Sequence, residues 1–307
     1  MIVDPITLIA ALIVVSTPVL LAAIGELVVE KTGVLNLGVE GMMIIGAVTG
    51  FVVGVETQSV LLAFIAGMVG GALLSAVFAV LTQLLLANQV ATGLALTLFG
   101  LGLAALLGIG YSGSLPPSVP DVFPQAVQDI PLIGPILFGH SAMIYLAVLL
   151  VAAVWYVLNH TRIGLILRAV GESHDAAHAL GYKVVRIRML AILFGGACAG
   201  LSGAFLSVAR VQNWIDGMTA GAGWIALALV VFASWKPWRL LVGAYLFGGI
   251  AALQLRLQAA EVGVPVALLD ASPYLITIIV LVIISSDRSR AALNAPAALG
   301  KVFHASG

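Results

Sequence analysis

The chain alternates long apolar runs with short polar connections. The apolar runs approach the roughly 20 residues that an α-helix needs to cross the hydrocarbon core of a bilayer. We therefore predict an all-α polytopic membrane protein with about nine transmembrane helices, within a range of about eight to ten. The expected spans are residues 6–24, 38–55, 60–87, 90–110, 141–158, 188–208, 218–235, 238–258 and 273–286.

Composition excludes a soluble fold, because 62% of the residues are hydrophobic and only 8% are charged. The formal net charge is zero, so nothing indicates a nucleic-acid partner. The single cysteine, Cys198, excludes a disulfide framework. No basic residue precedes the first apolar run, so we expect a retained helix rather than a secretory signal. We divide the chain into one membrane domain, residues 1–286, and a weakly structured cytoplasmic polar tail, residues 287–307.

Cations predict the orientation. Eleven of the 13 Lys and Arg residues fall on one set of alternating connections, and only Arg210 and Arg256 fall on the other. The positive-inside rule then places the N-terminus outside and the C-terminus inside. In "SWKPWR", Trp235 and Trp238 flank two cations, as an interfacial belt would. The proline-rich stretch 111–135 contains no cation and is expected to be an external loop, with short re-entrant pieces.

Two glycine-rich stretches predict broken helices. The apolar run 223–234 would cover only about 18 Å of a core about 30 Å thick, so the preceding "DGMTAGAG" (216–223) must supply the missing depth. Such backbone is tolerated inside a membrane where it is buried in protein or lines a wet cavity. Gly33, Gly38 and Gly41 interrupt the approach to the second span in the same way. Paired interrupted segments indicate the substrate path of a transporter.

Polar residues of these two stretches are the candidates for the transport path. An acidic residue at the edge of a span is costly and therefore suggests function, although hydrogen bonding that holds helix ends together is the alternative. By contrast, we expect Glu26 and Glu30 to lie beside Lys31 in a solvated turn on the inner face. Glycines at four-residue spacing, such as those at 46, 50 and 54 and at 196 and 200, predict close helix packing. The path candidates are Asn36, Glu40, Gly41, Thr219 and Trp224.

The inner connection 159–189 contains a predicted short exposed helix. Ser173 can cap its N-terminus, Asp175 lies in its first turn and Gly181 can end it. This geometry suits insertion into a groove of a partner protein. His174 and His178 have the spacing of a zinc-binding "HExxH" motif, but no third ligand is evident, so we predict no metal site and no cofactor. No phosphate-binding "GxxxxGK[ST]" occurs, so any ATP must bind another subunit.

The stretch "DAAHALG" (175–181) resembles the EAA-x-x-x-G coupling motif of ABC importer permeases, with Asp175 in place of Glu. "EKTGVLNLGVEGMM", "RAVGESHDAAHALGYKV", "GAGWIALALVVFASWKPW" and "SPYLITIIVLVII" extend the resemblance over residues 13–284. Together they resemble permeases of the branched-chain amino acid and ribose type, and most of all the branch that serves nucleoside and purine uptake. Where such relatives often carry Asn in "GLALN", this chain has Thr97.

The resemblance implies a non-enzymatic permease subunit in a prokaryotic cytoplasmic (inner) membrane. Its partners would be cytoplasmic ATPase subunits, a second, homologous and non-identical permease subunit, and an extracytoplasmic binding protein that docks on loops 111–135, 211–222 and 259–272. A simple sugar or a branched-chain amino acid is an alternative solute. An ion-coupled secondary transporter is the alternative class, with Glu40 as its sole plausible relay. The implied ATPase-coupling residues are Glu172, Ser173, Asp175, Ala176, Ala177, Leu180 and Gly181.

Overall fold

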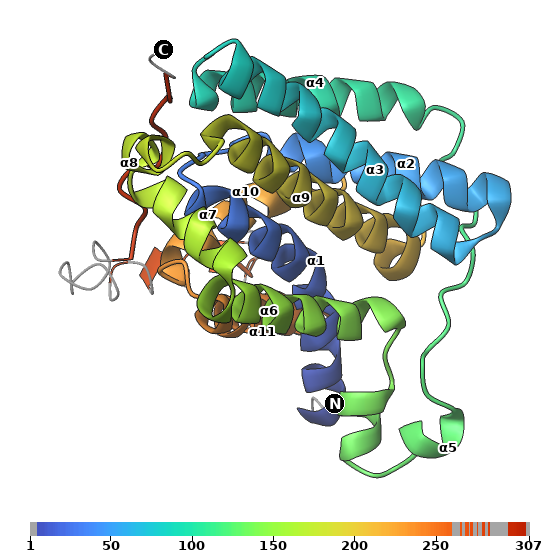
Figure 1. Ribbon diagram of the computed structural model, residues 1–307. Coiled ribbons are helices and arrows are strands. Elements are labelled where there is room, and N and C mark those ends of the chain that lie inside the picture. Colours follow the sequence, from blue (N-terminus) through green and yellow to red (C-terminus); the bar gives the residue numbers. More distant parts are fainter. Residues whose placement is uncertain are drawn as a thin grey trace.

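A computed structural model describes residues 5–259, 265, 268–269, 271–272, 275, 278–279, 282 and 294–304. The named elements of this part of the chain are all helices (Figure 1). A single isolated β-bridge joins Asp121 to Ser141 within it. The elements are α1 (Pro5–Lys31), α2 (Val39–Thr57), α3 (Val60–Ala79), η1 (Val80–Leu84), α4 (Gln89–Leu107), α5 (Gln125–Gln128), η2 (Gly134–Phe138), α6 (Ala142–His160), α7 (Arg162–Glu172), α8 (His174–Ala179), α9 (Val184–Ala204), η3 (Phe205–Val211), α10 (Ala222–Phe232) and α11 (Pro237–Ala259).

Seven helices of the described chain are long and apolar enough to cross a membrane. They match seven of the nine expected spans, and η1 and η3 prolong two of them as π-helical turns. The expected span 218–235 is indeed interrupted, because α10 has only 11 residues and follows a non-helical stretch. The last expected span, 273–286, lies mostly outside the described residues. The expected total of about nine therefore stays a prediction, as does the orientation of the termini.

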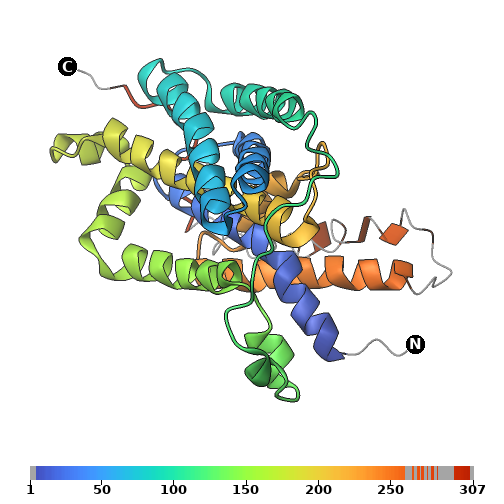
Figure 2. The same ribbon diagram turned by 90° about the vertical axis from the view of Figure 1, so that its right-hand side faces the viewer.

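α9 forms the centre of the bundle and packs against α1, α2 and α3. α11 crosses α1, and α6 joins it on the side of the bundle away from α3 and α4 (Figure 2). Glycines permit the closest crossings: a Cβ on Gly46 would collide with the backbone of Gly200, and one on Gly71 with that of Gly196. The glycine spacing thus predicted packing correctly.

The first helix is longer than hydropathy suggested. α1 continues to Lys31, so Glu26 and Glu30 lie inside the helix, with exposed fractions of 0% and 1%. The expectation of a solvated turn there was wrong. Trp235 is also buried, at 7% exposure, and its indole Nε1–H donates to Glu30 Oε2 at 2.5 Å. Trp238 is 43% exposed, so of the two tryptophans only Trp238 has the exposure expected at an interface.

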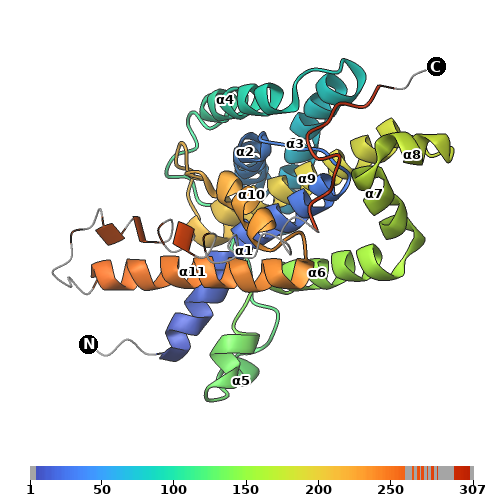
Figure 3. The same cartoon turned by 90° about the vertical axis from the view of Figure 1, so that its left-hand side faces the viewer.

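The proline-rich stretch and the tail differ in character. Residues 111–141 leave the bundle and carry only the short α5 and η2 (Figure 1). Residues 294–304, expected to be weakly structured, instead pack beside α7 and α8 (Figure 3). Ala298 and Phe303 are buried there, at 2% and 5% exposure. The described part of the tail is therefore part of the packed structure, at the end of the bundle opposite the start of α1.

Candidate transport and coupling sites

The two glycine-broken segments are non-helical and lie against each other. Residues 32–38 connect α1 to α2, and residues 212–221 lead into α10. Positive φ angles of +84° at Gly33 and +85° at Gly221 turn the backbone where a side chain would be strained. Gly223 permits the contact, because a Cβ there would lie 2.6 Å from the backbone nitrogen of Glu40. The two segments that the sequence indicated as counterparts are thus in contact in the folded protein.

Glu40 joins the two segments. Its carboxylate accepts the Thr219 hydroxyl at 2.5 Å and the backbone N–H groups of Gly221 at 2.9 Å and Gly223 at 2.7 Å. Gly221 and Ala222 begin α10, while Glu40 itself lies in the first turn of α2. A negative charge is favoured at a helix N-terminus, where N–H groups lack intrahelical partners. The Glu40 carboxylate lies at the N-terminal ends of both α2 and α10, which explains how a buried acid is stabilised here.

Asn36 and Thr97 hold the first broken segment. The Asn36 side-chain oxygen accepts from the Gly38 N–H at 3.0 Å, and the Asn36 backbone N–H donates to Glu26 Oε1 at 3.3 Å. The Thr97 hydroxyl donates to the Leu37 carbonyl at 3.0 Å, so this residue anchors α4 to the segment. Gly41 also faces α4, since a Cβ on it would lie 2.8 Å from Thr97 Cα.

The five path candidates therefore divide by exposure. Asn36, Glu40 and Thr219 are buried, at 0%, 3% and 3%. Their hydrogen bonds hold helix ends together, which was the structural alternative for these residues. Trp224, in the first turn of α10, is 48% exposed and is the one whose side chain reaches the surface. The structure brings Glu40 and Thr219 into contact and places Trp224 beside them.

α8 is an exposed two-turn helix, as the sequence predicted. The Ser173 hydroxyl oxygen accepts from the Ala176 N–H at 3.2 Å, which caps the N-terminus. At the other end Gly181 has φ +87°, its N–H donates to His178 O, and the Tyr182 N–H donates to Ala177 O, which is a Schellman motif. Of the predicted coupling residues only Ala177 is buried; Glu172, Ser173, Asp175, Ala176, Leu180 and Gly181 are all exposed.

The two histidines of α8 have partners other than a metal. Both rings contact Phe303 edge-on, at centroid distances of 5.3 Å for His174 and 5.4 Å for His178. Burial, and then the Arg188 guanidinium, lowers the pKa of His174. His174 Nδ1 therefore accepts from Arg188 Nη2, at 3.4 Å. No group of three metal-ligating side chains occurs within the described residues.

Comparison with known proteins decides the class. Residues 8–285 match the family described as the permease component of the branched-chain amino acid transport system. The chain belongs to this family. The resemblance inferred from "DAAHALG" and the longer stretches is confirmed, and the ion-coupled secondary transporter is set aside. As a permease subunit the protein is not itself an enzyme, and it is a multi-pass protein of the inner membrane.

Individual relatives carry two kinds of solute in their names. The permease is 47% identical over 256 residues to a putative glucose ABC transporter permease of Haloferax volcanii, covering 82% of this chain and 78% of the relative. It is 32% identical to a nucleoside permease of Lactococcus lactis and 30% identical to a guanosine permease of Bacillus subtilis, each over 89% of this chain and 90% of the relative. No solved structure matches the chain.

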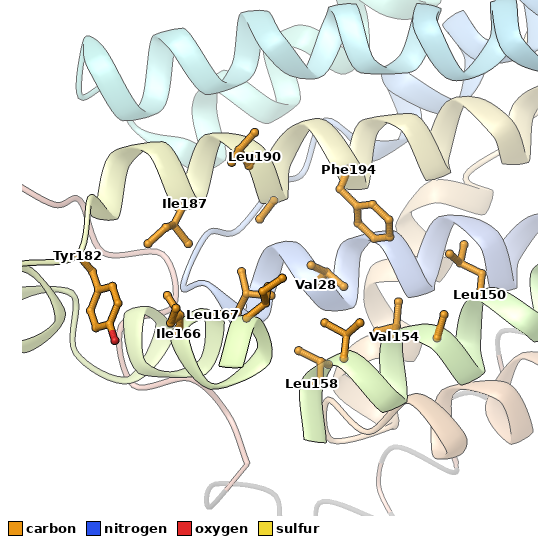
Figure 4. Close-up of a pocket in the computed structure, with 14 residues that line it drawn as sticks. Val28, Leu150, Val154, Leu158, Ile166, Leu167, Tyr182, Ile187, Leu190 and Phe194 are labelled. Carbon is orange, nitrogen blue, oxygen red and sulfur yellow. The ribbon is translucent and has the colours of Figure 1, made fainter. Parts of the chain in front are cut away.

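An apolar cavity of about 450 Å³ lies between α1, α6, α7 and α9 of the permease (Figure 4). Its lining includes Val28, Val154, Ile166 and Phe194, and Tyr182 at one end is the sole lining residue with a polar side-chain group. Solute sites combine apolar walls with several polar groups that fix orientation. This lining offers too few partners for a hydroxyl-rich solute, so we do not place the cavity on the transport path.

Several polar residues of the structure escaped sequence reasoning. The Glu30–Trp235 hydrogen bond joins residues 205 positions apart. Arg188 is one of the cations of the inner connection 159–189, yet its exposed fraction is 0%. One sequence signal pointed to its burial: in "VVRIRMLAIL" Arg188 directly precedes the apolar run of α9. A charge at the edge of such a run is costly unless other groups pair with it.

Proposed function

We propose that the permease is one half of the pore of an ATP-driven importer that admits a small polar solute with a sugar ring. The observation that carries this proposal is the meeting of two broken segments at Glu40, with Trp224 exposed beside it. In membrane transporters such paired interruptions mark the substrate site. Trp224 and the surface around Thr219 would border the path, with Glu40 and Asn36 behind them as positioning residues.

A nucleoside is our first candidate for the solute. Relatives named for nucleoside and guanosine transport extend over 89% of the chain. Glucose is the second candidate, because the relative at 47% identity carries that name. Nucleosides, glucose and ribose share a hydroxylated ring, and an exposed tryptophan face suits such a ring or a base stacked against it. A binding protein outside would make the selection, docking on loops 111–135 and 211–222; loop 259–272 lies mostly outside the described residues.

Energy would enter through α8, which we place on the cytoplasmic side. An ATPase subunit binding Leu180 and the residues around Asp175 would transmit closure of the ATPase pair to the bundle. Import then requires that ATP and the loaded binding protein both favour the same conformation of the permease over the other. A second, homologous permease subunit would complete the pore.

Reconstitution tests the proposal and the solute together. The permease, its partner permease, the ATPase and the binding protein are placed in liposomes and supplied with radiolabelled guanosine or glucose. We expect ATP-dependent accumulation of one of them, lost with an ATPase variant that cannot hydrolyse ATP. Trp224→Ala should reduce transport, and Trp238→Ala serves as the matched control. Uptake by the permease alone without ATP, or accumulation of neither solute, would refute the proposal.

A further inference from the structure

The tail segment 294–304 is hydrogen-bonded to the end of α7 and to the turn after α1, and Arg188 is bonded to the same turn. The Ala298 N–H donates to Gly171 O at 2.9 Å, at the end of α7, and the Gly300 N–H donates to Gly33 O at 3.0 Å, in the turn after α1. Lys31 Nζ donates to the Asn294 carbonyl at 3.0 Å. The segment therefore bridges the helix that leads to α8 and the turn that leads to α2.

Arg188 completes this bridge from the start of α9. Its guanidinium donates to Thr32 O at 3.1 Å, to Lys301 O at 3.2 Å and to His174 Nδ1 at 3.4 Å. A fully buried guanidinium is costly unless its donors are used, so removing any one of these acceptors destabilises the arrangement. One side chain thus ties α8, the turn after α1 and the tail together.

Phe303 holds the inner face of α8. Its ring lies between His174 and His178 and packs in a small buried cluster with Val170, Ala177 and Val184. Asp175, whose carboxylate lies 3.5 Å from His174 Nε2, and Leu180 at the end of α8 are both exposed. The tail therefore packs on α8 and leaves these two side chains accessible to a partner.

From this geometry we propose that residues 294–304 and Arg188 form a positioning link, which makes the turn at 32–33 follow the motion of α8. The turn continues directly into Asn36 and Glu40, and hence into the contact with α10. The link is thereby a physical connection from the ATPase-coupling helix to the paired broken segments. This inference rests on the proposed function, since it assigns the route by which ATPase motion reaches the path.

Phe303→Ala in the reconstituted complex tests the link, with Lys301→Ala as the matched control. Arg188 uses only the backbone carbonyl of Lys301, and the Lys301 side chain is exposed. A variant lacking residues 294–307 and an Arg188→Met variant accompany them. We expect solute moved per ATP hydrolysed to fall about 2- to 30-fold in these three variants, while basal ATP hydrolysis persists. Lys301→Ala should match the wild type.

Hydrogen exchange gives a readout that is independent of transport. Phe303→Ala and the truncation should raise exchange in peptides covering both 174–181 and 32–38, and leave peptides of α3 unchanged. If exchange at 32–38 stays at the wild-type level, or if the coupling ratio is unchanged, the link is refuted. A wild-type complex that moves no solute would refute the proposed function instead, while exchange would still report whether the link exists.

Discussion

Glu40 and Gly223 join two helix beginnings: the Glu40 carboxylate accepts the Gly223 N–H at 2.7 Å. The carboxylate lies in the first turn of α2, and the N–H lies in the first turn of α10. Two helix dipoles therefore point their positive ends at one buried charge. The contact is short because Gly223 has no side chain to separate the helices.

Replacing this acid tests the contact. Glu40→Gln removes the charge and one acceptor oxygen, which leaves a buried N–H unpaired and should lower the free energy of unfolding by about 2 kcal/mol. Thermal unfolding in detergent micelles measures the effect. Glu56→Gln is the matched control, because Glu56 is exposed and accepts only the Tyr111 hydroxyl. Equal stability of the two variants would contradict the role of Glu40.

The crossing of α2 and α9 depends on missing side chains. Gly46→Ala places a methyl group against the backbone of Gly200 and should destabilise the protein by about 1–3 kcal/mol. Gly102→Ala, in α4, meets nothing within 4 Å and should leave stability unchanged or raise it by up to about 1 kcal/mol. The two melting temperatures make the comparison, and a Gly46→Ala variant as stable as Gly102→Ala would argue against tight packing there.

The indole of Trp235 satisfies a buried carboxyl group. Trp235→Phe keeps an aromatic ring but removes the five-membered part of the indole with its N–H donor to Glu30, and should cost about 1–3 kcal/mol. Trp238→Phe, three residues further along the same "SWKPWR" stretch but 43% exposed, is the control. Chemical denaturation of both variants gives the difference. A smaller loss for Trp235→Phe than for Trp238→Phe would be inconsistent with this hydrogen bond.

Leu180 is an apolar side chain on the exposed face of α8, with an exposed fraction of 76%. Leu180→Asp should weaken binding of the ATPase subunit, because it places a charge in a contact that buries apolar surface, without changing the melting temperature of the permease. Co-purification and solute-stimulated ATP hydrolysis measure this. Leu115→Asp, 77% exposed in the proline-rich stretch 111–135 that we expect on the other side of the membrane, should leave ATPase binding unchanged.

His174 predicts a pH dependence. Its pKa lies below the ordinary 6.5, first because of burial and then because of Arg188. Between the lowered pKa and pH 6.5, the unfolded chain therefore binds more protons than the folded protein. The stability that neutral His174 contributes is complete above about pH 6.5 and is lost as the pH falls through the lowered pKa. NMR titration should give a higher pKa for His174 in Arg188→Met. The resonance is assigned with His174→Gln, and an unchanged or lower pKa would speak against the contact.

Much of this architecture follows from local sequence. Apolar runs predicted the positions of seven spans, and capping residues predicted both ends of α8, because those signals depend on neighbours within a few residues. Burial of Glu26 and Glu30 could not be predicted in this way. Their hydrogen-bond donors are Asn36 and Trp235, which lie beside them only in the folded chain. A hydropathy scale gives an acidic residue the same value whether or not such a donor is present.

In the candidate site, too, local features were predicted from the sequence and long-range contacts were not. Glycines at 33, 38 and 41 and the stretch 216–223 predicted two interruptions, and the structure has them at 32–38 and 212–221. The pairing of the two was inferred from their corresponding places in the two halves of the chain. That Glu40 acts as a cap for α10 could be seen only from its contacts with Thr219 and Gly223 in the folded chain. The packing of Phe303 on α8 was likewise hidden, because it joins residues more than 120 positions apart.

The position of residue 304 matters to anyone who purifies this protein. Phe303, one residue earlier, touches α8. An affinity tag or fluorescent reporter fused directly after residue 304 would begin beside the helix that we propose binds the ATPase. A fusion ahead of Pro5, at the far end of α1, keeps that surface clear and is the better choice for assays of the assembled transporter.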